Sequence, residues 1–168
     1  MSSYTNNNNY LITTLETLPL SSSLTGTVSV VNTKTAVVGV ATLFTTEIGY
    51  SGSDISIQST SPTKLGWLWD TTNGEIRRIT DVLSATLLYI EEPFTNNLAG
   101  ATVKLVPVSR YKAIEWTDTG GGGGEVNGIA LSPAESGGVF AGDFRNTNVD
   151  PIIFDGTGGD IAVTVSYV

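Results

Sequence analysis

The stretch Thr27-Val-Ser-Val-Val-Asn-Thr-Lys-Thr-Ala-Val-Val-Gly-Val-Ala41 decides the fold class, because two runs of alternating small polar and β-branched residues flank one turn. Successive side chains of a strand point to opposite faces, so a period of two is typical of a half-buried β-strand. Asn32-Thr-Lys34 has the polar composition of a turn between antiparallel strands. The stretch therefore predicts a β-hairpin.

Outside this hairpin, short β-like runs recur along the chain, separated by Gly, Pro, Asn and Asp. The longer ones are Asp54–Gln58, Gly66–Asp70, Glu75–Val82, Thr86–Glu91, Thr102–Val108, Tyr111–Thr117, Pro151–Asp155 and Ile161–Val168. Asn73-Gly74 and Asn127-Gly128 are signals for tight hairpins, since both central residues of a type I′ turn need positive φ. Leu43–Ile48 is compatible with one helical turn, and we find no long amphipathic helix. We expect an all-β protein of antiparallel sandwich-like or barrel-like modules.

The pattern divides the chain into three parts. Residues 1–23 form a polar N-terminal arm, 24–108 a first β-module, and 109–168 a second, smaller β-module. The arm contains apolar residues that would be costly to leave in water, at roughly 25 cal/mol per Å². It is interpreted either as a flexible arm or as one that orders against a neighbouring subunit. The spacing of Leu11, Ile12, Leu15 and Leu18 also fits one face of a short helix.

Composition excludes several classes of function. The net charge of −8 comes from 16 acidic and 8 basic residues, and the adjacent pair Arg77–Arg78 would point to opposite faces of a strand. No basic patch is visible, so we expect no nucleic-acid binding. The absence of cysteine excludes disulfides and thiolate chemistry, and the absence of histidine removes the commonest general base and metal ligand. No apolar run approaches the ~18 residues of a membrane span, so we expect no membrane partner.

Three sequence features are candidates for chemical sites. Glu91 and Glu92 are adjacent and face opposite ways on a strand, so they cannot flank one glycosidic bond. Asp155-Gly-Thr-Gly-Gly-Asp160 resembles one turn of a repeat-type calcium site, but a single copy favours a tight loop. Gly120–Gly124 lacks the residues of a phosphate loop and is interpreted as a flexible or closely packed loop that lets another backbone approach. We expect no catalytic residue, no cofactor and no bound metal.

The tryptophans offer one binding chemistry. Trp67 and Trp69 lie two residues apart, on one face of a predicted strand, and an aromatic platform of this kind can stack on sugar rings. Packing in the core or between subunits is the favoured interpretation of this spacing, and glycan binding is the alternative.

Two parts of the chain resemble β-modules of tailed-phage virion proteins. The first is carried by Gly26–Val31, Val37–Gly49, Asp54–Ile57 and Ile76–Ile90, and the second by Val126–Ser136 with Val149–Asp155. Ala41-Thr42 stands where a second glycine is usual in the first pattern, and Ala134 replaces the usual glycine in the second. The resemblance implies a virion component without catalytic residues.

Resemblance and composition together lead to a hypothesis about function. We expect a capsid decoration (cement) protein on the capsid surface, a homo-oligomer such as a trimer, with the major capsid protein as its partner. The expected contact residues are Leu11, Ile12, Leu15 and Leu18 of the arm, followed by Trp67 and Trp69. One alternative is a tail or head–tail junction component, and another is a carbohydrate-binding adhesin that uses the tryptophans.

Overall fold

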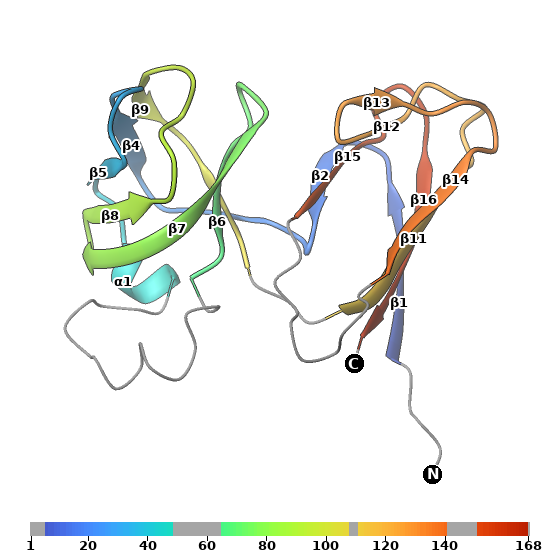
Figure 1. Cartoon of the computed structure of the whole chain (residues 1–168), viewed down its shortest axis with the longest axis horizontal. Coiled ribbons are helices and arrows are strands. Elements are labelled where there is room, and N and C mark those ends of the chain that lie inside the picture. The colour runs from blue at the N-terminus through green and yellow to red at the C-terminus, as the bar shows by residue number, and fades with distance from the viewer. Residues whose placement is uncertain (1–5, 49–64, 108–110, 141–150, 168) are drawn as a thin grey trace, which may run out of the picture. The chain divides into compact units, whose positions relative to one another are not determined.

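The computed structural model describes residues 6–48, 65–107, 111–140 and 151–167, and within these residues the fold is all-β with one short helix (Figure 1). The predicted fold class is thereby confirmed. The chain divides into two compact units, Leu20–Val108 and Met1–Pro19 with Ser109–Val168. We call them the barrel module and the sandwich module. The predicted strand Asp54–Gln58 lies outside the described residues.

The barrel module is one sheet of eight strands, in the order β3-β10-β6-β7-β8-β5-β4-β9. The two ends of this order meet, because β3 and β4 are successive parts of one run of chain, and so are β9 and β10. β3 pairs with β10 and β4 pairs with β9, so the sheet closes on itself. The elements are β3 (Ser22–Ser23), β4 (Thr27–Val30), β5 (Ala36–Val40), α1 (Phe44–Glu47), β6 (Trp67–Asp70), β7 (Glu75–Ser84), β8 (Leu87–Ile90), β9 (Leu98–Ala101) and β10 (Lys104–Val106).

Alternation along the strands fills the barrel interior with apolar side chains. In β5, Val37 is fully buried while its neighbour Val38 is half exposed, as a period of two requires. The largest buried members of this core are Phe44, Leu68, Ile79, Leu88, Ile90 and Phe94.

The sandwich module has two four-stranded antiparallel sheets, in the orders β1-β16-β11-β14 and β13-β12-β15-β2. Their shared core includes Ile12, Leu18, Ile114, Val126, Phe154, Ile161 and Val163. The strands are β1 (Asn6–Ile12), β2 (Leu15–Leu18), β11 (Tyr111–Asp118), β12 (Glu125–Val126), β13 (Ile129–Ala130), β14 (Ser136–Phe140), β15 (Ile152–Asp155) and β16 (Ile161–Tyr167).

The topology contradicts the prediction that residues 1–23 form a separate N-terminal arm. β1 pairs with β16 along its whole length, from Asn6 opposite Tyr167 to Ile12 opposite Ile161, and β2 pairs with β15. Residues 6–18 are therefore strands of the sandwich module rather than an arm or a short helix. The predicted boundary at residue 109 coincides with the observed one, and the barrel module begins at Leu20 rather than at residue 24.

The two Asn-Gly hairpins differ from each other. Asn127 and Gly128 have φ of 50° and 77° between β12 and β13, as a two-residue type I′ turn requires. Gly74 has φ of 68°, but Asn73 is not in the positive region, and four residues separate Asp70 from Glu75. The reason is the buried Asp70, whose carboxylate accepts hydrogen bonds from the Thr72 N–H at 3.1 Å and from Asn73 Nδ2, so that a wider loop forms.

Two alanines occupy left-handed backbone conformations. Ala41 has φ of 56° and Ala134 has φ of 60°. Ala134 follows Pro133 in a turn closed by the Glu135 N–H donating to the Ser132 carbonyl at 3.0 Å, where a type II geometry favours glycine. These are the positions at which the β-module patterns that the sequence resembles usually have glycine.

Replacing Ala134 with glycine should therefore stabilise the sandwich module. Removing the Cβ relieves the steric cost of positive φ, and the greater entropy of glycine in the unfolded chain cancels part of the gain. We expect Ala134→Gly to raise the free energy of unfolding by about 0.5–1 kcal/mol in urea denaturation. Ala130→Gly, in β13 and outside the positive-φ region, is the control and should be neutral or destabilising.

Candidate binding face

The predicted contact residues of the N-terminal segment are distributed over both faces of the sandwich strands. Ile12 and Leu18 are buried in the core of their own module, and Leu15 is half buried. Leu11 lies on the opposite face of β1 from Ile12 and is 59% exposed. Of these four residues, Leu11 is therefore the one whose side chain is mostly available to a partner.

Trp67 and Trp69 are both buried, so neither ring forms an open platform. They alternate in β6 with Leu68, which belongs to the barrel core, and so they share the other face of the sheet. Lys104 Nζ lies 5.3 Å from the centre of the Trp69 ring, a cation–π distance. This placement agrees with the packing interpretation and removes the exposed rings that the glycan interpretation needs.

The barrel module instead exposes an apolar patch that was not predicted. Val38 and Val40 point outward from β5 and are 51% and 65% exposed, and Val31, directly after β4, is 55% exposed. The core does not require these side chains, since it is filled by residues on the other face of the same strands. An exposed group of apolar side chains on one sheet face is a candidate for an interaction site. We call Val31, Val38 and Val40 the valine face.

A groove of about 430 Å³ runs beside the valine face. Apolar side chains of Val30, Val31, Ala36, Val38 and Leu98 supply most of its walls, with Ser29, Lys34 and Asn97 at polar positions. It lies where β4 pairs with β5 on one side and with β9 on the other. A partner would therefore find exposed valine side chains beside a recess with mostly apolar walls.

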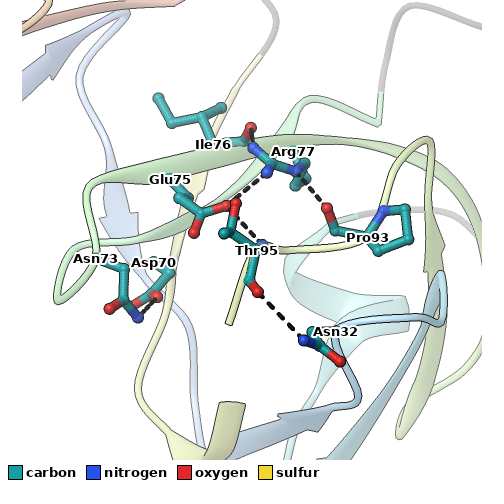
Figure 2. Close-up of polar contacts among 8 residues, drawn as sticks. All are labelled: Asn32, Asp70, Asn73, Glu75, Ile76, Arg77, Pro93 and Thr95. Atoms are coloured by element: carbon teal, nitrogen blue, oxygen red, sulfur yellow. Dashed lines mark hydrogen bonds and ion pairs between the residues drawn. The ribbon is translucent and has the colours of Figure 1, made fainter. Parts of the chain in front are cut away.

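A polar network holds one wall of the groove. Asn97 belongs to the segment 91–97 between β8 and β9, and its Oδ1 accepts the Asn32 N–H at 2.7 Å. Asn32 Nδ2 also donates to the Thr95 carbonyl at 3.3 Å, as Figure 2 shows. Both bonds fix the 91–97 segment against the turn between β4 and β5.

The same segment is anchored to β7 by an ion pair. Glu75 accepts the Thr95 N–H at 3.0 Å and pairs with the guanidinium of Arg77, which also donates from Nε to the Pro93 carbonyl at 2.9 Å (Figure 2). The Arg77 guanidinium lies 5.3 Å from the centre of the buried Phe94 ring. Because the charges of Arg77 and Glu75 are both satisfied within this network, we assign the pair a structural role in keeping the groove formed.

The two glycine loops of the sandwich module pack against each other. A Cβ built on Gly158 would lie 2.3 Å from the Gly123 carbonyl oxygen, and one on Gly123 would lie 2.8 Å from the Gly158 carbonyl oxygen. The Gly120–Gly124 segment is thus closely packed, and the backbone that approaches it belongs to this chain. Asp155 Oδ1 accepts the Thr157 N–H at 2.9 Å, as in a tight turn.

Charge is unevenly divided between the modules. In the sequence, the segments of the sandwich module contain nine acidic and three basic residues, a net charge of −6, whereas Leu20–Val108 contains seven and five, a net charge of −2. The valine face therefore belongs to the less charged module. Within the described ranges, no three His, Cys, Asp or Glu residues gather into a metal-binding group, and no helix has the length and apolar character to cross a membrane.

Comparison of the chain with protein-family models, curated proteins and solved structures finds no match.

Proposed function

We propose that this chain is a non-enzymatic structural protein of a tailed-phage virion, a decoration protein that stabilises the capsid by bridging shell subunits. The observation that carries the proposal is the valine face with its adjoining groove. Apolar side chains exposed at this density are unfavourable in water, and their burial against a partner would recover roughly 25 cal/mol per Å². A decoration protein acts through surface burial of this kind.

The distribution of charge supports the same function. Protein interfaces are depleted of charge at their centre. Of the eight residues that line the groove, Lys34 alone is charged. The acidic residues are concentrated in the other module, where they would keep a densely decorated surface hydrated. We propose the major capsid protein as the partner, the capsid surface as the location, and self-association into a homo-oligomer as a further contribution to cementing.

A binding assay with purified heads that lack this protein tests the proposal. We expect the wild-type chain to bind such heads and to raise the temperature at which they release their DNA. Val38→Asp places a charge at the centre of the valine face, and we expect it to weaken binding by at least about tenfold because a desolvated charge opposes association. The readout is co-sedimentation with heads, together with circular dichroism of the free variant.

Ile129→Asp is the matched control, since Ile129 is 71% exposed but belongs to the sandwich module. It should bind as the wild type does. If the wild-type chain ignores the heads, the decoration function is wrong. If Val38→Asp and Ile129→Asp bind equally well, the valine face is not the contact surface.

The two alternatives predict other outcomes. A tail or head–tail junction component would be located at the tail or portal in labelled virions rather than over the head surface. An adhesin would bind glycans in a titration with free sugars, but the burial of Trp67 and Trp69 removes the residues assigned to that role.

A further inference from the structure

Strand β1 forms one edge of a sheet in the sandwich module. It pairs with β16 on one side over all seven residues without a shift in register, and it is the terminal strand in the order β1-β16-β11-β14. Every second peptide group of a terminal strand points away from the sheet and lacks a strand partner there. β1 therefore offers a row of backbone donors and acceptors to another strand.

β1 lacks the features that usually protect a sheet edge. Natural edges are protected by charges, proline, bulges or shortness. β1 has the sequence Asn6-Asn-Asn-Asn-Tyr-Leu-Ile12, with no charge, no proline and no bulge. Among the other edge strands described for the sandwich module, β13 has two residues, β2 contains Glu16 and β14 contains two glycines. The barrel sheet closes on itself, so β3 and β9 are not free edges.

Side chains on the two faces of β1 differ in role. Tyr10 and Ile12 pack into the sandwich core. Asn9 is exposed on the other face, where its Oδ1 accepts the Thr164 hydroxyl at 2.9 Å, and Leu11 is exposed on the same face. The core side therefore fixes the strand. Within the described residues, no strand pairs with its outer edge, and Asn9 and Leu11 are exposed on its outer face.

We propose that β1 pairs with β1 of a second copy of this chain, antiparallel and across a two-fold axis. If the seven residues overlap fully, residue 9 lies at the axis opposite its own copy. An amide side chain is both donor and acceptor, so Asn9 can pair with itself, whereas any charged residue would oppose its like. A two-fold pairing also uses the same surface on both copies and leaves no further β1 edge open.

This inference rests on the self-association that is part of the proposed function, and it specifies the surface. We expect the wild-type chain to sediment as a dimer. Asn9→Asp places like charges opposite each other and should raise the dimer dissociation constant by at least about tenfold. Asp keeps an oxygen that can accept the Thr164 hydroxyl, so the fold should be retained. Asn96→Asp, an equal change of charge in the barrel module, is the control and should not alter the dimer.

Variants of opposite charge at residue 9 distinguish a loss of strand pairing from a defect in folding. Asn9→Lys alone should also be monomeric, and a mixture of the Asp and Lys variants should recover dimers that contain one of each. Asn9→Cys adds the single cysteine of the chain and should crosslink the dimer on oxidation, whereas Ile129→Cys should not.

Three results would overturn the pairing: a monomeric wild type, a trimer, or a dimer unaffected by Asn9→Asp. The proposed function is judged separately. A monomer that still binds heads through the valine face refutes only the β1 pairing, and a β1 dimer that ignores heads refutes only the decoration function.

Discussion

Leu18→Ala is expected to lower the free energy of unfolding of the sandwich module by about 2–5 kcal/mol. Leu18 is 1% exposed, belongs to the sandwich core, and is held opposite Ile152 by the pairing of β2 with β15. Removing its methyl groups leaves a cavity that close neighbours in two sheets cannot fill. If residues 1–23 were a free arm, the same substitution would have almost no effect on stability.

Leu11→Ala is the matched control for this experiment. Leu11 is the same residue type in the same N-terminal segment, but its side chain is mostly exposed, so we expect a change within about 0.5 kcal/mol. Urea denaturation is monitored by hydrogen exchange of individual peptides. This readout assigns each unfolding transition to one of the two modules. A loss of protection confined to the sandwich strands is expected for Leu18→Ala, and equal effects of the two variants would contradict the placement of β2.

Gly123→Ala is expected to lower the free energy of unfolding of the same module by about 2–5 kcal/mol. Gly123 has φ of 96°, so alanine there would be strained by the backbone conformation alone. Its Cβ would also lie 2.8 Å from the Gly158 carbonyl oxygen, and because both partners are backbone, relief requires one loop to move.

Gly121→Ala in the same loop separates the two contributions. Gly121 has φ of 86°, close to that of Gly123, but a Cβ there meets no atom within 4 Å. We expect this variant to lose only about 1–2 kcal/mol, the cost of positive φ for alanine. The difference in the free energy of unfolding between the two variants, measured by urea denaturation, reports the close packing of the glycine loops. Equal free energies would show that the loops are not in contact.

Local strand patterns in the sequence predict most of the barrel module. The alternation in residues 27–41 and the turn at Asn32–Lys34 correspond to β4, β5 and their connection, and the helical turn at 43–48 corresponds to α1. β4 and β5 pair with each other across a short turn, so local periodicity is sufficient for this hairpin. It does not give their other partners, β9 and β8, which lie far along the chain. The loop at Asn73-Gly74 differs from the prediction because the hydrogen bonds of Asp70 are not visible in a dipeptide signal.

The N-terminal strands could not be predicted in the same way. The partner of β1 is β16, about 155 residues along the chain, and no local pattern marks such a pair. The four apolar residues of this segment are divided between two strands, with Leu11 and Ile12 in β1 and Leu15 and Leu18 in β2. Each strand has a period of two, but the spacing of the four residues taken together also fits one face of a helix. The valine face was missed for a related reason, since Val38 and Val40 have the same residue type as the buried Val37 and the sequence does not say which face of β5 is covered.

In the sequence, the barrel module is inserted between β2 and β11 of the sandwich module. This insertion governs the order in which the two modules can fold during synthesis. Leu20–Val108 emerges from the ribosome before β11 to β16, so the barrel can close first, through contacts within about ninety residues. β1 and β2 emerge before it and must wait for the last strand, β16, to be translated. Until then, β1 lacks its strand partner from its own chain, so its backbone groups can pair with an identical strand of another nascent copy.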